Sequence, residues 1–167
     1  MQPTAEEIVA LLELAGPTTC GYVSETYRSH REVPCAELPS GFDGSRALGN
    51  VLYFLVTPQA RVLLHRIRSD QMYHHYLGSP LEVLLLGVSG RVELHVIGPN
   101  LAAGERPQLL IPGKTFHAAR VAGNGDYSLL GTSVWLRADA ADVEIGDVNV
   151  LAARFPDAAR QLNGFLA

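Results

Sequence analysis

Two short segments of the chain hold the side chains best suited to chemistry. Residues 65–78 contain His65, Gln71, Tyr73 and two further histidines, and residues 111–117 contain His117. A neutral imidazole can accept a proton near physiological pH, and it can also bind a transition metal. A phenol such as that of Tyr73 can return a proton. These segments therefore favour either acid–base chemistry or metal binding.

Short apolar runs separated by turn residues must position these side chains. This spacing is typical of a β-sandwich or barrel and not of alternating strands and helices. Residues 34–49, rich in Gly, Pro and Ser, are expected to form a long surface loop. The predicted strands span residues 51–57, 62–67, 72–77, 81–88, 91–97, 109–111, 116–121 and 127–136.

Both ends of the chain are predicted to be helical. Thr4 and Glu7 form a capping-box pattern in which each side chain satisfies a backbone donor, and apolar residues follow at helical spacing. Gly16 and Pro17 are expected to end this helix. At the other end of the chain, Pro156 suits the first turn of a final helix.

Composition limits the classes of protein and partner. With 167 residues, of which 47% are hydrophobic and 18% charged, the chain is expected to form one globular domain. The net charge of −4 and the lack of a Lys or Arg run argue against nucleic-acid binding. No apolar run approaches the roughly 20 residues of a membrane helix, and the first residues carry acids where a signal peptide is basic. A cytoplasmic protein without a membrane partner is expected, with Cys20 and Cys35 as idle thiols.

The two histidine segments resemble the paired motifs of the cupin superfamily. The first motif usually runs His-x-His, three or four residues, Glu, six residues, Gly, and the second runs Pro-x-Gly-x-x-His. In this sequence Ile67 stands at the second histidine position and Gln71 at the glutamate position, and Gly113 comes one residue early. Only His65 and His117 remain as strong metal ligands, so an ordinary metal-dependent cupin is not expected.

Further motifs resemble one branch of the superfamily, cupin family 5, over roughly residues 21–132. That resemblance implies a small single-domain jelly roll that typically dimerises. We therefore expect an all-β cupin domain, a double-stranded β-helix, with an N-terminal helix within 1–16, a jelly roll over 21–146 and a helical segment over 150–167. The matching residues are Gly21-Tyr22, Glu25 to Ser29, Tyr53 to Leu55, His65 to Ile67, Asp70, His74, Gly78, Pro80 to Glu82, Pro107-Gln108 and Pro112.

Strand alternation suggests which side chains share the cavity of such a barrel. If Gln71 points inward, Tyr73 and His75 share its face. His74 then points outward unless a bulge reverses the alternation. The resemblance implies that His65 and His117 come from neighbouring strands, and burial would lower the pKa of such histidines. Arg28 and Tyr53, within the matched motifs, are further candidates for substrate contacts, together with Gln71 and His75.

Three functions remain open from the sequence. The first is an enzyme that moves protons on a small molecule without a metal, as an isomerase, epimerase, cyclase or dehydratase, with His65, His117 and Tyr73 as catalytic residues. The second is a metal-dependent oxygenase or lyase, with a divalent metal weakly held by His65, Gln71 and His117. The third is a non-catalytic module that binds a small ligand.

A homodimer is the expected assembly. The runs 81–86 and 51–56 are apolar at successive positions, so both faces of these strands should be covered. A second subunit packed against the outer sheet would explain this pattern.

Overall fold

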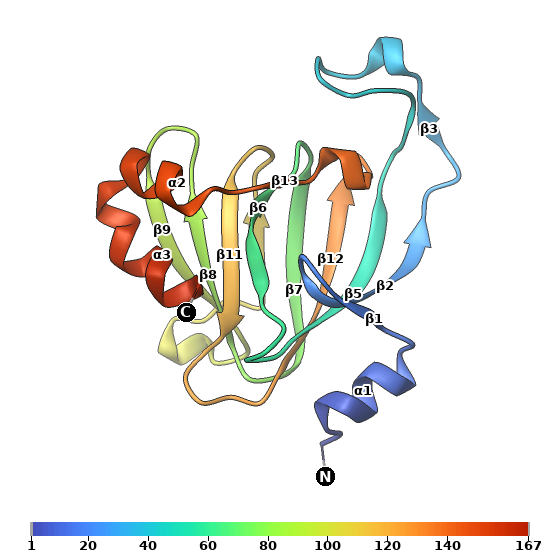
Figure 1. The fold of residues 1–167 in the computed structure, drawn as a ribbon. Coiled ribbons are helices and arrows are strands. Elements are labelled where there is room, and N and C mark those ends of the chain that lie inside the picture. The colour runs from blue at the N-terminus through green and yellow to red at the C-terminus, as the bar shows by residue number, and fades with distance from the viewer. Residues whose placement is uncertain (1, 167) are drawn as a thin grey trace.

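Two antiparallel β-sheets face each other in the computed structural model, which describes residues 2–166 (Figure 1). The larger sheet contains, in order, β1 (Ala15–Thr18), β2 (Gly21–Arg28), β5 (Asn50–Val56), β12 (Ser128–Trp135), β7 (Asp70–Gly78) and β10 (Gln108–Ile111). The smaller sheet contains β13 (Glu144–Ile145), β6 (Val62–Arg66), β11 (Phe116–Val121), β8 (Leu81–Leu86) and β9 (Val92–Ile97). A separate pair, β3 (Glu32–Val33) and β4 (Arg46–Ala47), forms an arm at one end.

Each apolar run predicted as a strand forms one, with ends that differ by a few residues. The spacing of apolar runs missed β1, β2 and the two-residue strands β3, β4 and β13. Strand β2 is largely exposed toward its C-terminal end and joins the sheet mainly through backbone pairing with β5, so it has no continuous apolar run. The expected loop at 34–49 contains β4 and a 3₁₀ turn, Cys35–Glu37. Three more 3₁₀ turns span Leu101–Ala103, Ala140–Asp142 and Pro156–Ala158.

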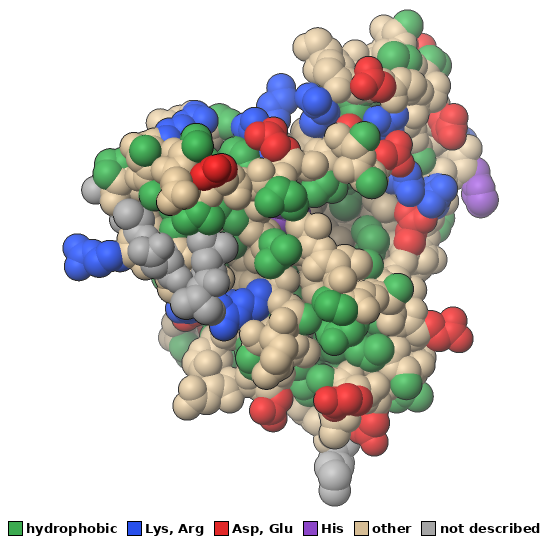
Figure 2. Space-filling model, in the orientation of Figure 1, with side chains coloured by type: hydrophobic (Ala, Val, Ile, Leu, Met, Phe, Trp, Pro, Cys, Tyr) green, Lys and Arg blue, Asp and Glu red, His purple; other side chains and the backbone are tan. Residues whose placement is uncertain are grey.

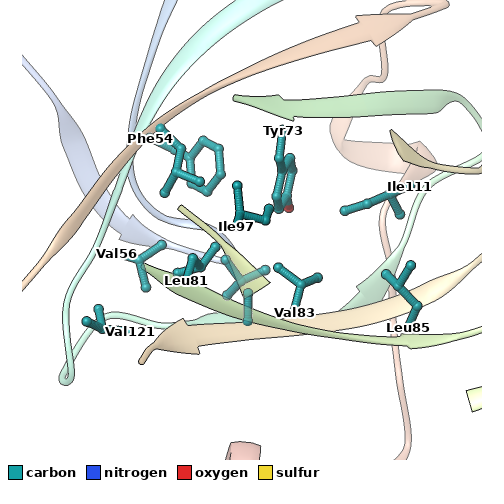
Figure 3. Packing of buried hydrophobic residues seen from close by; sticks show 12 residues of the cluster. Phe54, Val56, Tyr73, Leu81, Val83, Leu85, Ile97, Ile111 and Val121 are labelled. Atoms are coloured by element: carbon teal, nitrogen blue, oxygen red, sulfur yellow. The ribbon is translucent and has the colours of Figure 1, made fainter. Parts of the chain in front are cut away.

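The space between the sheets is filled at one end by a hydrophobic core. The rings of Phe54 and Tyr73 lie with their centroids 4.7 Å apart above Leu81, Val83 and Ile97 (Figure 3). These side chains come from both sheets, because alternate residues of each strand point inward. Phe54 and Tyr73 also form part of the wall of the cavity described below, so the packed core supports that wall.

Helices cover the outer faces of the two sheets. Helices α2 (Val148–Arg154) and α3 (Ala159–Leu166) bury Leu84 and Leu86 on the outer face of β8 (Figure 1). Helix α1 (Ala5–Leu11) packs in one cluster with Leu55 of β5. The same chain therefore covers much of the apolar outer surface that suggested a second subunit. The homodimer stays a prediction, and it no longer follows from these two strands.

Helix α1 begins as predicted but ends earlier. The capping box is present, with the Thr4 backbone N–H donating to Glu7 at 2.8 Å and the Glu7 N–H donating to Thr4 Oγ1 at 3.2 Å. The helix ends at Leu11, before Gly16, because Glu13 takes a left-handed conformation (φ 52°) and turns Leu14 into the core. No helix among the described residues is long and apolar enough to cross a membrane.

The helical cover predicts a large difference between two leucine substitutions. Leu162 is fully buried in the cluster that α3 forms with β8 and β11, whereas Leu101 is exposed. Leu162→Ala should lower the free energy of unfolding by about 2 to 5 kcal/mol, because it leaves a cavity in a packed cluster. Leu101→Ala should change it by less than about 0.5 kcal/mol. Urea unfolding measures both values, and equal effects would contradict the proposed packing.

Candidate functional site

The register between β6 and β11 brings the two predicted imidazoles together. His65 lies directly opposite His117, and their ring centroids are 4.3 Å apart. Both side chains are buried, and His117 is 0% exposed. The rings therefore meet inside the barrel, between the two sheets.

Strand β7 supplies the facing wall. Gln71 and Tyr73 are both buried, two residues apart on the inward face. The Tyr73 hydroxyl lies 3.0 Å from His117 Nε2, and the Gln71 amide nitrogen lies 3.5 Å from the same atom. The phenol is the shorter and stronger partner. Tyr73 and His117 thus form a hydrogen-bonded pair that spans the two sheets.

Backbone carbonyls set the tautomers of the two histidines. His65 Nδ1 lies 2.7 Å from the Leu63 carbonyl, which can only accept, so Nδ1 carries the proton. His65 Nε2 is then an acceptor, and the Cys20 thiol donates to it at 3.7 Å. His117 Nδ1 faces the Thr115 carbonyl at a longer 3.5 Å. His117 Nε2 is therefore the acceptor for the Tyr73 hydroxyl.

Burial keeps all four titratable groups uncharged. Desolvation, followed by the nearby His65, holds the pKa of His117 well below its usual 6.5. Desolvation also lowers the pKa of His65. Desolvation raises the pKa of Tyr73 well above 10 and that of Cys20 to about 12. At physiological pH the imidazoles are thus neutral bases and the phenol and thiol keep their protons.

A cavity of about 160 Å³ lies against this cluster. Its wall is mostly apolar, and no Asp, Glu, Lys or Arg occurs among the described residues that form it. His117 does not line the cavity but lies next to three residues that do, His65, Gln71 and Tyr73. The residues that line the cavity are Thr19, Cys20, Val23, Asn50, Leu52, Phe54, His65, Ile67, Gln71, Tyr73, Thr132, Val134, Ala138 and Val143.

His75, a predicted substrate contact, does not line the cavity. It shares the face of Gln71 and Tyr73, as alternation predicts, but lies one row farther along, opposite Leu130. Its Nε2 instead lies 3.1 Å from the Ser79 carbonyl. The register shift in β7 comes after His75, so His74 stays outward and bonds Ser133 Oγ at 3.1 Å.

Arg28 and Tyr53, the other predicted substrate contacts, also lie outside the cavity. The Arg28 side chain is 55% exposed and pairs with Glu25 at 2.6 Å. Tyr53 is on the outer face of β5, where its ring packs edge-on against Tyr76. Alternation explains this correction for Tyr53, because the inward positions of β5 are Asn50, Leu52 and Phe54.

The sequence interpretation missed four polar residues of the cavity wall, Thr19, Cys20, Asn50 and Thr132. Cys20, expected to be idle, reaches His65 because it bridges to Val62 at the start of β6. Asn50 comes just before a predicted strand, and Thr132 sits inside one. A usable signal was present for Asn50, since it shares the parity of Leu52 and Phe54 in an otherwise apolar strand.

A buried ion pair holds the segment that closes one side of the cavity. Ala138 and Val143 line the cavity, and this segment crosses the end of the barrel between β12 and α2 (Figure 1). Arg46 Nη2 lies 3.3 Å from the Asp142 carboxylate, and both side chains are buried. Figure 2 shows charged side chains clustered along the upper rim of this face, whereas the recess below is bordered mostly by uncharged surface.

The residues present do not fit a metal dication. A transition metal generally takes three or four ligands with some anionic charge. The set His65, Gln71 and His117 offers two neutral imidazoles and an amide, and Tyr73 already occupies His117 Nε2. The described residues contain no group of three or more His, Cys, Asp or Glu side chains placed to hold a metal ion.

Comparison with known families identifies the family of this chain. A family model described as Cupin_5, cupin superfamily (DUF985), matches residues 6–145. The chain belongs to the Cupin_5 family. The resemblance inferred from the motifs is thus confirmed. No curated protein sequence matches this Cupin_5 chain.

Solved structures confirm the cupin fold. A hypothetical protein from Leishmania major is 26% identical, with a TM-score of 0.84 and 98% of each chain covered. A protein from Shewanella oneidensis is 27% identical, with a TM-score of 0.83 and 98% of each chain covered. A dTDP sugar isomerase from Desulfovibrio desulfuricans is 15% identical, with a TM-score of 0.53 over 80% of this chain and 88% of its own. The last likeness shows the shared fold alone.

The buried histidines predict loss of stability in acid. Unfolded histidine binds a proton near its usual pKa of 6.5, whereas folded His117 does so only at lower pH. As the pH falls through this window, protonation favours the unfolded state, by about 1.4 kcal/mol per pH unit for each such histidine. The free energy of unfolding, measured with urea at several pH values, should have a shallower slope against pH in His117→Gln than in the wild type. Ile111→Val, a core substitution without a titrating group, should keep the wild-type slope; a His117→Gln slope equal to it would contradict the assignment.

Restoring a carboxylate should create a metal site. Gln71→Glu places an anion beside His117, so we expect Ni²⁺ or Zn²⁺ to bind at least about tenfold more tightly than to the wild type. Isothermal titration calorimetry gives both affinities. A wild type that already binds these ions tightly and stoichiometrically would show that the present donor set is sufficient.

Proposed function

We propose that this cupin catalyses metal-independent acid–base chemistry on a small molecule, of the isomerase, epimerase, cyclase or dehydratase type. One observation carries the proposal: a group able to take a proton and a group able to give one line the same uncharged cavity. These groups are His65 and Tyr73.

His65 is suited to the role of base. Its Nδ1–H is fixed by the Leu63 carbonyl, which leaves the Nε2 lone pair on the side of the ring that meets Cys20. Cys20 and His65 both line the cavity. When a ligand displaces the weak 3.7 Å thiol contact, Nε2 can accept a proton from the ligand. The Leu63 carbonyl then stabilises the resulting imidazolium through the same Nδ1–H.

Tyr73 is suited to the role of acid, and His117 positions it. In the absence of a ligand the phenol donates to His117 Nε2. Rotation of the hydroxyl toward the cavity lets it donate to a ligand oxygen on which negative charge develops. His117 does not line the cavity and acts through Tyr73, so it is a positioning residue in this proposal.

The proposed steps balance in protons and need no oxidant or reductant. His65 Nε2 takes one proton from a carbon next to a carbonyl group, while Tyr73 gives a proton to the carbonyl oxygen, which forms an enol. In the second half, Tyr73 regains a proton from an enol hydroxyl and His65 returns its proton to carbon. A general acid or base of this kind contributes about 10²- to 10⁴-fold, and positioning in the cavity adds to this.

Removal of the phenolic hydroxyl tests the proposal. The chelator-treated protein is incubated in D₂O with dihydroxyacetone, hydroxyacetone and glycolaldehyde, and ¹H NMR follows exchange of the hydrogens next to the carbonyl. For compounds that raise the unfolding temperature, we expect exchange above the buffer rate. Tyr73→Phe should slow it by about 10²- to 10⁴-fold, since the ring is kept and the acid is lost. The exposed Tyr27→Phe is the matched control and should exchange at the wild-type rate.

Each other outcome opposes the proposal. Equal exchange by wild type and Tyr73→Phe would remove Tyr73 from the chemistry. Binding without exchange would favour a non-catalytic module. Exchange abolished by the chelator and restored by iron or nickel would favour the metal-dependent oxygenase or lyase alternative.

A further inference from the structure

We infer that the cavity binds a small uncharged molecule bearing hydroxyl groups, and that Asn50 and Thr132 recognise it. This inference deepens the proposed function, because it names the substrate class of the same cavity. Binding can nevertheless be measured without turnover, so the two proposals can fail separately.

Asn50 presents a fixed hydrogen-bond acceptor. Its Nδ2 donates to Glu25 Oε1 at 2.8 Å, and a carboxylate can only accept, so the orientation of the amide is set. Glu25 is itself held by Arg28 at 2.6 Å and by Arg137 at 3.1 Å. Asn50 Oδ1 therefore points away from Glu25. The residue is 6% exposed, and Oδ1 has no partner among the described residues.

Thr132 presents a second unused polar atom. Its side chain is buried at 9% exposure, and Oγ1 also has no hydrogen-bond partner among the described residues. Buried polar atoms in proteins are nearly always hydrogen-bonded, because leaving one unpaired is costly. Both Asn50 and Thr132 line the cavity, so a ligand in it is the partner that we propose for both atoms. Asn50 Oδ1 requires a donor, which a hydroxyl group supplies.

The sheet register places these two atoms beside the proposed acid. Thr132 lies directly opposite Tyr73 on the neighbouring strand. In the next inward-facing row, Val134 of β12 lies between Asn50 of β5 and Gln71 of β7. Inward residues of adjacent rows are within reach of one small molecule. A ligand bound by Asn50 and Thr132 therefore lies against Tyr73.

The cavity wall selects against charge and large size. A charged group buried without a partner carries a large desolvation cost, and the wall has no Asp, Glu, Lys or Arg to pair with it. The volume of about 160 Å³ is close to the roughly 150 Å³ of a protein cavity that holds benzene. The ligand thus has on the order of six non-hydrogen atoms, which excludes nucleotides and phosphorylated sugars from the cavity itself.

Three related probes test the selectivity for neutral molecules. Glycerol is neutral, glycerate carries a negative charge, and serinol carries a positive charge at neutral pH. Saturation-transfer NMR with the wild-type protein should show binding of glycerol and binding at least about tenfold weaker for the two charged probes. Failure of glycerol to bind, or binding of glycerate as tight as that of glycerol, would overturn the inference.

Two substitutions test the recognition residues. Thr132→Val keeps the shape of the side chain and removes the hydroxyl, so glycerol should bind about three- to tenfold more weakly. Asn50→Leu should have a similar effect where it folds, and Thr132→Val decides the question where it does not. Ser133→Ala, next in the chain but on the outer face, is the control and should bind as wild type does. Unchanged binding by Thr132→Val would overturn the inference.

Tyr73→Phe separates the two proposals. Its glycerol affinity should stay within about threefold of wild type, because Asn50 and Thr132 are unchanged. Glycerol binding without carbonyl exchange would leave this inference standing while the proposed function fails. Carbonyl exchange that does not depend on Thr132 would leave the proposed function standing while this inference fails.

Discussion

The contact between two neutral imidazoles inside the barrel determines the character of the whole site. The register of β6 and β11 sets His65 opposite His117, with ring centroids 4.3 Å apart. Two imidazolium ions at this distance, without a nearby anion, would repel each other in a medium that already disfavours charge. The doubly charged pair is therefore disfavoured, and burial lowers the pKa of each ring. The partners follow from this constraint: backbone carbonyls accept from Nδ1, and Cys20 and Tyr73 donate to the two Nε2 atoms.

The barrel interior is divided between packing and binding. At one end, side chains from both sheets fill the space and hold Tyr73 against Phe54. At the other end, the wall has polar atoms that no described neighbour satisfies, at Asn50 and Thr132. The charged groups lie outside this space, in the Glu25 network and the Arg46–Asp142 pair, where they fix the orientation of Asn50 and hold the closing segment. Charge thus stabilises the walls while the cavity itself stays neutral.

The sequence predicted the architecture better than the details of the site. Alternation correctly put Tyr73 on the face of Gln71 and His74 on the other, because the register shift in β7 lies beyond both. It failed to show that His75, on the inward face, bonds Ser79 instead of facing the cavity, since distance along a strand is not encoded in parity. Cys20 and Thr132 gave no usable signal. Their roles depend on pairing between segments far apart in the chain, which local patterns do not specify.

The protonation of the two buried histidines is the most direct test of this account. Protein labelled with ¹⁵N in its histidine rings can be titrated from about pH 8 to about pH 6 and followed by long-range ¹H–¹⁵N correlation. We predict that His117 remains neutral throughout and that His65 is protonated only below the usual pKa of 6.5, with the proton of each neutral ring on Nδ1. Resonances of both rings that move to the imidazolium position around the usual pKa of 6.5 would contradict a neutral pair and the uncharged cavity built on it.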